Sequence, residues 1–220
     1  MSVATKPPPP RDRLGIGVSG HRLPPKLPQQ SQAPLRTQID NLFAALAANA
    51  RLDHAADPAT KIVVVSSLAE GSDRIVAQAG LAAGFGLQAV LPFARAEYAR
   101  DFATAASRAE FEGLLASAAD VIELDGAANE RPRAYEAAGL VMLAHCDLLI
   151  AIWDGKRAAG VGGTADIVAR AIAAEKLVVW VKPAKPGAMQ LSRSGVKDFS
   201  VADAASVARA AKEIMTPAVR

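Results

Sequence analysis

The sequence predicts an α/β fold in which a mostly parallel sheet of about six strands has helices on both faces. Short apolar runs alternate with longer segments of helical periodicity, which is typical of parallel strands joined by right-handed crossovers. Two runs, residues 61–66 and 147–153, are apolar through their middle, as expected for strands covered on both faces. The chain of 220 residues, 51% of them hydrophobic, is long enough to bury one core.

The first two predicted strands flank a helix. Residues 14–18 alternate apolar side chains with glycine, which indicates a strand that ends in a polar loop. That loop is rich in proline as far as Pro34. From Leu35 onward, apolar side chains recur at helical spacing, so an amphipathic helix is expected to pack on the sheet. The β-branched run 61–66 then predicts a central strand.

The middle of the chain continues this alternation. A second helix is expected to end near Gly84, which would form a left-handed cap. Residues 87–91 predict a third strand, because Pro92 stops the run. Residues 94–118 are expected to form one or two helices, and residues 120–124 a short fourth strand.

The remaining elements complete the predicted sheet. A helix at 132–144 leads into the buried strand 147–153, and a glycine-rich loop then opens onto a helix at 164–174. Residues 177–181 are expected to close the sheet, and a weak alanine-rich helix follows at 202–215. This order of elements is Rossmann-like in the broad sense.

One domain with loose ends is the expected organisation. Residues 1–13, which include four consecutive prolines, are expected to form a disordered leader. Residues 14–182 would form the Rossmann-like domain, and residues 183–220 a C-terminal extension that contains the weak helix.

Charge and composition exclude several functional classes. The net charge is only +3 and the cationic residues are scattered, which does not favour a dedicated nucleic-acid binder. A single cysteine, Cys146, excludes an internal disulfide, and three widely spaced histidines do not indicate a zinc site. No signal peptide and no apolar run of membrane-spanning length is present. A cytoplasmic protein without a metal, a cofactor or a membrane contact is therefore expected.

The first candidate binding loop follows the first strand. Gly15, Gly17 and Gly20 match the dinucleotide fingerprint G-x-G-x-x-G, but two of them lie inside the predicted strand and no helix can begin directly afterwards. A nicotinamide dinucleotide is therefore not favoured. Gly20, His21 and Arg22 are nevertheless candidate ligand-binding residues, because glycine permits close approach and arginine can bind a phosphate. A solvated turn is the alternative.

The second candidate loop follows the central strand. Its candidate ligand-binding residues are Ser67, Glu70, Gly71, Asp73 and Arg74. Hydroxyls, acids and unpaired amides at the start of a helix suit a ribose or a phosphate. Alternatively, Ser67 and Glu70 form a capping box and the next two charges belong to the first turn of the helix.

The third candidate loop is the glycine-rich one before the helix at residue 164. Its backbone amides can form a phosphate-binding loop at the carboxyl end of a buried strand. It lacks the G-K-[ST] ending of a P-loop, so triphosphate hydrolysis with magnesium is not supported. A plain flexible loop is the alternative. Its candidate ligand-binding residues are Asp154, Gly155, Gly160, Gly162, Gly163 and Thr164.

The sequence contains no complete catalytic motif. The segment around Ser19 is not a nucleophile elbow, because His21 stands where the second glycine belongs. Cys146 is interpreted as a small core residue. Glu70 and Asp166 are the candidates for an acid or base, although no spacing rule pairs them.

Five ordered motifs resemble the SLOG superfamily over about residues 14–182. This Rossmann-like group contains the lonely-guy phosphoribohydrolases, the DNA-processing protein A family, molybdenum-cofactor carrier-like proteins and nucleotide-sensing domains of bacterial defence systems. The resemblance implies a nucleotide-derived ligand held by the three loops. The motifs are Gly20-His-Arg22, Leu68-Ala-Glu-Gly-Ser-Asp-Arg74, Val90-Leu-Pro-Phe93, Cys146-Asp-Leu-Leu-Ile-Ala-Ile-Trp-Asp-Gly155 and Gly162-Gly-Thr164.

The resemblance does not extend to the catalytic residues of the lonely-guy enzymes. When their P-G-G-x-G-T-x-x-E signature is aligned on Gly163 and Thr164, Ala159 occupies the proline position and Ile167 the position of the catalytic glutamate. The arginine that these enzymes carry on the preceding helix corresponds to Ala138.

The leading functional hypothesis is a sensor that binds a nucleotide or a nucleotide-derived metabolite at the carboxyl ends of the strands. The alternative is a nucleotide N-glycosidase or phosphoribohydrolase that uses Glu70 or Asp166. Single-stranded DNA binding is a third hypothesis, which the modest charge disfavours. Self-association through the helices around Phe102 and Phe111 stays open.

Overall fold

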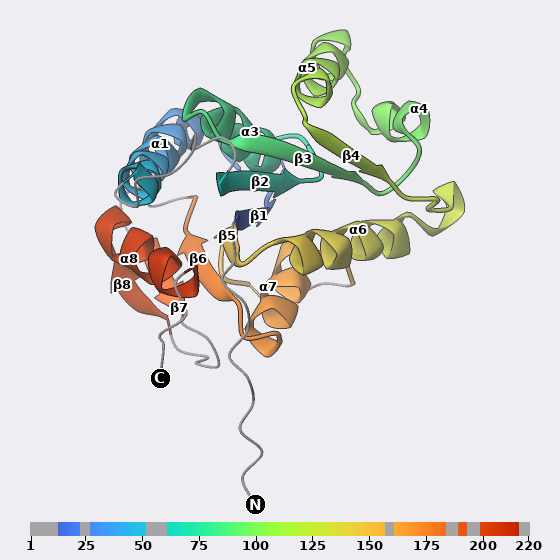
Figure 1. The fold of residues 1–220 in the computed structure, drawn as a ribbon. Coiled ribbons are helices and arrows are strands. Elements are labelled where there is room, and N and C mark those ends of the chain that lie inside the picture. The colour runs from blue at the N-terminus through green and yellow to red at the C-terminus, as the bar shows by residue number, and fades with distance from the viewer. Residues whose placement is uncertain are drawn as a thin grey trace, which may run out of the picture.

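The computed structural model describes residues 13–22, 27–51, 61–156, 161–183, 189–192 and 199–215. Within them, eight strands form one sheet in the order β4-β3-β2-β1-β5-β6-β7-β8 (Figure 1). The strands are β1 (Leu14–Gly20), β2 (Ile62–Ser66), β3 (Gly86–Leu91), β4 (Asp120–Glu123), β5 (Leu148–Ile152), β6 (Leu177–Val181), β7 (Met189–Ser192) and β8 (Ser200–Ala202).

Helices connect the parallel strands, as the alternating pattern predicts. Strands β1 to β6 pair in parallel, whereas β7 and β8 continue the sheet antiparallel. The predicted α/β class with a mostly parallel sheet is therefore confirmed. The helices are α1 (Gln29–Arg51), α3 (Ser72–Ala82), α4 (Arg95–Tyr98), η1 (Ala99–Asp101), α5 (Ala105–Ala116), η2 (Ala128–Glu130), α6 (Arg131–His145), α7 (Thr164–Ala173) and α8 (Ala204–Met215).

The strand order reverses between β1 and β5. Strand β1 pairs with β2 on one side and with β5 on the other, so the chain first builds outward to β4 and then returns to build β5 and β6. The register places Gly20 opposite Ile152, so the carboxyl ends of the two strands meet. In open α/β sheets, ligands bind in the crevice outside such a reversal.

Two groups of helices cover the two faces of the sheet (Figure 1). Successive residues of a strand point to opposite faces, and both Val64 and Val65 of β2 are fully buried. Val64 belongs to the core beneath α1, α3 and α8, and Val65 to the smaller core beneath α6 and α7. This double burial explains why β2 and β5 appear in the sequence as continuous apolar runs.

Two glycines in β1 allow α6 to lie close to the sheet. A β-carbon on Gly15 would meet the carbonyl oxygen of His145 and lie 2.9 Å from Cα of Cys146. A β-carbon on Gly17 would meet the sulfur of Met142 and lie 2.7 Å from Sγ of Cys146. The G-x-G pattern therefore has a packing explanation inside the strand.

Aromatic side chains hold α4, η1 and α5 together. Tyr98, Phe102 and Phe111 are at most 1% exposed, and their ring centroids lie 4.9–5.6 Å apart. Tilted and edge-to-face contacts of this kind add to the apolar burial. These rings are buried in the core and cannot form a contact between two copies of the chain. Self-association through the outer faces of the same helices stays a prediction.

Helix α1 begins at Gln29, six residues before the predicted start, and contains Pro34. Proline removes one helical hydrogen bond, which explains the expectation of a later start. The first turn is fixed before the proline, because Leu27 is fully buried and the amide of Ser31 donates to the carbonyl of Pro28 at 2.9 Å. Burial of Leu35 continues the same helix, so tertiary contacts override the local signal.

The prediction that residues 177–181 close the sheet is wrong. Strand β7 pairs antiparallel with β6, and β8 pairs with β7. Strands of four and three residues carry too little periodicity to stand out in a polar segment. Helix α8 packs mainly on α1, which gives the predicted C-terminal helix its place. Among the described residues, no helix is both long and apolar enough to cross a membrane.

Candidate functional site

A cleft of about 470 Å³ lies at the carboxyl ends of β1 and β5. The starts of α3 and α7 flank it from opposite faces of the sheet, because these helices belong to the two different cores. The cleft therefore occupies the place where the reversed strand order predicts a ligand. Its lining residues are Val18, Ser19, Gly20, His21, Arg22, Ser67, Ala69, Asp73, Tyr98, Tyr135, Ala138, Gly139, Met142, Trp153, Asp154, Lys156, Val161, Gly162, Gly163, Thr164, Ala165 and Ile167.

The end of β1 is fastened to the start of α3. The carbonyl of His21 accepts hydrogen bonds from the amide of Ser72 at 3.2 Å and from its hydroxyl at 2.8 Å. A β-carbon on Gly20 would collide with the side chain of Ser72 and lie 2.9 Å from Cβ of Ile152. Glycine at this position therefore lets β1, β5 and α3 converge on the cleft.

His21 also fastens β1 to the loop after β5. The amide of Asp154 donates to Nε2 of His21 at 3.1 Å, and a carboxylate oxygen of Asp154 lies 3.3 Å from the same nitrogen. Burial opposes the charged form of Asp154, but the amide of Lys156 and the neighbouring histidine together lower the pKa of the carboxyl. Both residues thus shape the cleft wall.

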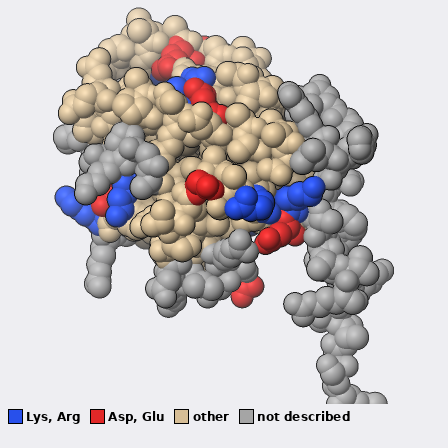
Figure 2. Space-filling view, turned by 90° about the vertical axis from the view of Figure 1, so that its left-hand side faces the viewer, with Lys and Arg blue, Asp and Glu red and all other residues tan. Residues whose placement is uncertain are grey.

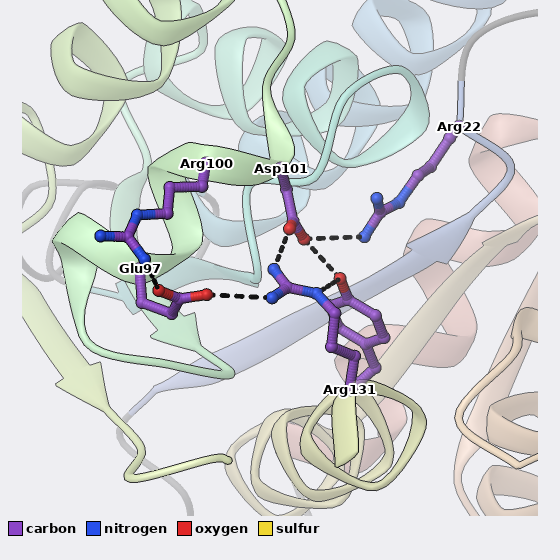
Figure 3. A network of polar contacts seen from close by, with 6 residues as sticks. Arg22, Glu97, Arg100, Asp101 and Arg131 are labelled. Carbon is purple, nitrogen blue, oxygen red and sulfur yellow. Dashed lines mark hydrogen bonds and ion pairs between the residues drawn. The ribbon is translucent and has the colours of Figure 1, made fainter. Parts of the chain in front are cut away.

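Arg22 is connected to a polar network formed by residues of α4, η1 and the start of α6 (Figure 3). Its guanidinium lies 4.0 Å from a carboxylate oxygen of Asp101 and 5.1 Å from the ring centre of Tyr135. The Tyr135 hydroxyl and Arg131 both donate to Asp101, and Arg131 also pairs with Glu97 at 3.0 Å. The Arg22 side chain is still 46% exposed, so an anion in the cleft can reach it.

Asp73, in the first turn of α3, is a buried acid in the cleft wall. It is 7% exposed, and burial raises the pKa of its carboxyl to about 7. Arg22, the amide of Ala69 and Arg74 each act in the opposite direction. Desolvation of the charged form is therefore the dominant effect.

A glycine turn begins α7. Gly162 has a φ of 74°, and a β-carbon there would lie 2.7 Å from the amide nitrogen of Glu136 and 2.9 Å from the carbonyl oxygen of Pro132. The residue before α7, Gly163, provides no side-chain cap, and Thr164 lines the cleft. The first amides of a helix lack intrahelical partners and favour an anion.

Most of the residues predicted from the three loops come together in this cleft. The predicted ligand-binding residues that line it are Gly20, His21, Arg22, Ser67, Asp73, Asp154, Gly162, Gly163 and Thr164.

Part of the second loop braces α3 against α5 instead. Glu70 accepts a hydrogen bond from the hydroxyl of Ser107. Arg74 is 2% exposed and pairs with Glu110 at 2.7 Å. Gly71 has a φ of 91° at the residue before α3. These three predicted ligand-binding residues do not line the cleft.

The capping box considered for this loop is wrong. Helix α3 begins at Ser72, and its N-cap position is Gly71, without a side-chain cap. Ser67 lies too far before the helix to act as its cap. The first-turn charges Asp73 and Arg74 are present, but both are buried rather than solvated.

The third loop is divided in the same way. Gly155 has a φ of 85° and packs against Trp180. Asp166 accepts a hydrogen bond from the amide of Gly162 at 3.0 Å and pairs with Arg170 at 3.1 Å. Gly160 lies outside the described residues.

Several cleft residues were not predicted as site residues. Tyr98 and Tyr135 come from α4 and α6, and Trp153 and Lys156 follow β5. Only the last two had a usable signal, because they belong to a loop at a strand end. The tyrosines reach the cleft through tertiary packing.

The positions that correspond to lonely-guy catalytic residues also face this cleft. Ala138 and Ile167, which occupy the arginine and glutamate positions, both line it and are at most 2% exposed. Ala159 lies outside the described residues. The cleft therefore has apolar side chains at the two positions that the sequence resemblance aligns with that catalytic pair.

No family model and no curated protein matches the chain. Among solved structures, it is similar to DNA processing protein A from Streptococcus pneumoniae, with 16% identity, a TM-score of 0.49 and coverage of 76% of this chain and 50% of that one. The protein of the same name from Helicobacter pylori is 17% identical, with a TM-score of 0.50 and coverage of 77% of this chain and 65% of that one. The structural-genomics target TM1055 is 18% identical, with a TM-score of 0.45 and coverage of 75% of this chain and 72% of that one.

The chain thus spans half of the Streptococcus protein and less than two thirds of the Helicobacter protein. At these identities the likeness concerns the fold alone. The Helicobacter structure, with a TM-score of 0.50, shows that the chain has the Rossmann-like fold expected from its resemblance to the SLOG superfamily.

Proposed function

We propose that the cleft between β1 and β5 binds a nucleotide or a nucleotide-derived metabolite, as a sensor would. The observation that carries the proposal is the convergence of an accessible arginine, Arg22, with the uncapped start of α7 in one cleft at the strand reversal. Arginine and helix amides are both suited to phosphate. A cleft of about 470 Å³ is within the usual range for small-molecule sites.

The apolar part of the cleft suits the remainder of such a ligand. Val18, Met142 and Ile167 are buried side chains of its lining, which also includes Tyr98 and Tyr135. Ligand sites typically combine an apolar lining with a few placed polar groups. A base or a sugar face can therefore be desolvated beside the anion-binding groups.

Binding without glycosidic cleavage is favoured over the hydrolase alternative. Glu70 and Asp166 are engaged by Ser107 and Arg170, and neither lines the cleft. The corresponding lonely-guy catalytic positions hold Ala138 and Ile167. General acid–base catalysis requires a titratable group within reach of the reacting bond, a condition that neither of these two predicted acids meets.

Single-stranded DNA is the competing ligand class. The Helicobacter neighbour is described by its single-stranded DNA binding mode. The present chain has a net charge of +3, and the charged side chains on the face with α1 and α8 are scattered (Figure 2). Binding of the phosphate backbone normally needs a gathered cationic surface. A compact ligand in the cleft is therefore the better proposal.

A thermal-shift screen tests this proposal. The intact chain would be heated with ribonucleoside monophosphates, cyclic nucleotides, ADP-ribose, NAD and oligo(dT), and each mixture would then be chromatographed. A ligand at a hundred times its Kd stabilises the native state by about 2.7 kcal/mol, which raises Tm by about 5–10 °C. A shift with the nucleotide intact supports binding.

Other results of the screen have different meanings. Release of free base would move the protein to the hydrolase class. A shift with oligo(dT) alone, steeply reduced by salt, would favour DNA. The absence of a shift with every nucleotide would contradict the proposed function.

A further inference from the structure

Anion binding does not explain the buried acid Asp73 in the cleft wall. Its carboxylate would repel a phosphate, yet it lines the same cleft as Arg22 and Thr164. Asp73 is only 7% exposed, so its ionised carboxylate has lost most of its contact with water. A buried carboxylate is stable only when other groups donate hydrogen bonds to it.

The surrounding protein groups leave acceptor capacity on this carboxylate. The amide of Ala69 donates one hydrogen bond to it. The ion pairs of the neighbouring arginines run to other acids, from Arg74 to Glu110 and from Arg22 to Asp101. An ionised carboxylate offers about four acceptor positions, so acceptor positions remain for a ligand.

The charged and titratable groups around Asp73 come from three elements. Arg22 follows β1, Arg74 lies on α3, and Tyr98 lies on α4. Tyr98 is 1% exposed, and burial raises the pKa of its hydroxyl, so it stays neutral. The two cations stabilise the ionised acid, so it can act as an acceptor above about pH 7.

The place of Asp73 matches the sugar of a nucleotide whose phosphate lies at α7. Helices α3 and α7 cover opposite faces of the sheet, so Asp73 and Thr164 approach the cleft from its two sides. A ribose presents two adjacent hydroxyl donors, and carboxylates bind ribose hydroxyls near the second strand of other doubly wound folds.

We infer that Asp73 is a specificity-determining residue that accepts hydrogen bonds from the ribose hydroxyls, so that the cleft selects ribonucleotides over 2′-deoxyribonucleotides. This inference rests on the proposed function and names its ligand class more narrowly. It also separates the cleft from a site for single-stranded DNA, whose sugars lack the 2′-hydroxyl.

The test compares the Kd values of matched ligands by isothermal titration at pH 8. The probes are AMP, GMP, CMP and UMP with the 2′-deoxy form of each, applied to the full chain and to Asp73→Asn, Asp73→Ala and Asp40→Asn. Asp40 is a control acid on the exposed side of α1. Because a deoxynucleotide lacks one hydrogen bond to the charged carboxylate, the wild type should bind it about tenfold or more weakly than the matching ribonucleotide.

The expected pattern is a ribose preference that disappears in Asp73→Ala, falls in Asp73→Asn, which keeps one neutral acceptor oxygen, and persists in Asp40→Asn. Equal affinity of the ribo and deoxy forms in the wild type would overturn the inference while leaving the proposed function intact. A preference that survives in Asp73→Ala would also overturn it. Failure of every nucleotide to bind would overturn the proposed function and the inference together.

Discussion

Gly20 shows how one missing side chain shapes the cleft. The amide of His21 donates to the carbonyl of Ile152 at 2.9 Å, and the carbonyl of His21 accepts hydrogen bonds from Ser72. A methyl group at Gly20 would enter the space between these two elements. Glycine is therefore required here by close approach, although its φ is not positive.

We predict that Gly20→Ala destabilises the protein by about 1–3 kcal/mol, because the added methyl overpacks the contact with Ser72. Urea denaturation measures the change. Gly113→Ala is the matched control, since nothing lies within 4 Å of its added carbon in α5. That variant should instead gain about 0.5–1 kcal/mol. A neutral Gly20→Ala would show that β1 and α3 are not held as described.

At the scale of elements, the start of α7 depends on the turn at Gly162. Its left-handed backbone and the close approach of α6 both require glycine. Asp166 supports the same turn by accepting the Gly162 amide. The residues proposed to bind phosphate are thus positioned by the contact between two helices.

We predict that Gly162→Ala lowers nucleotide affinity about tenfold or more, because the turn must move away from α6 and displaces the first amides of α7. Gly84→Ala is the control, because its φ of 79° brings similar strain but nothing lies within 4 Å of the added carbon. Gly84→Ala should lose stability, which urea denaturation measures, and keep the wild-type nucleotide affinity, which titration of both variants measures. Equal affinity in the two variants would contradict a role for the turn.

The elements were largely predictable because their signals are local. Double burial makes β2 and β5 continuous apolar runs, and the left-handed cap at Gly84 is confirmed. Strands β7 and β8 are too short to show a period, and Pro34 conceals the true start of α1. Local patterns thus fail where tertiary contacts decide the outcome.

The site was predictable only in part, for a related reason. Loops at strand ends meet at one sheet edge, so Arg22 and Thr164 could be placed together from the sequence. Tyr135 and Asp101 lie far from these loops in sequence, and only folding brings them beside Arg22. The burial that changes the chemistry of Asp73 also has no local signature.

At the scale of the whole molecule, the buried acid should make stability depend on pH. Burial raises the pKa of Asp73 to about 7 in the native state, above its ordinary value of 3.8. The native state therefore binds this proton more tightly than the unfolded state. The resulting stabilisation is complete below about pH 4 and is lost as pH rises through 7, by about 2 kcal/mol between pH 5 and 7.

We predict that Asp73→Asn removes this loss. The free energy of unfolding of the variant, relative to the wild type, should improve by about 3 kcal/mol between pH 5 and pH 8. Urea denaturation at both pH values measures it, and Asp40→Asn should show no such change. A relative stability of Asp73→Asn that does not depend on pH would mean that the acid is ionised with an ordinary pKa.

Arg22 and the start of α7 form the proposed nucleotide-binding cleft. Its most direct test is isothermal titration of the best nucleotide against the wild type, Arg22→Gln and the control Arg36→Gln, which removes a cation from α1. Loss of a charge-assisted contact should weaken binding to Arg22→Gln about tenfold or more and leave Arg36→Gln unchanged. Wild-type affinity in Arg22→Gln would contradict the claim.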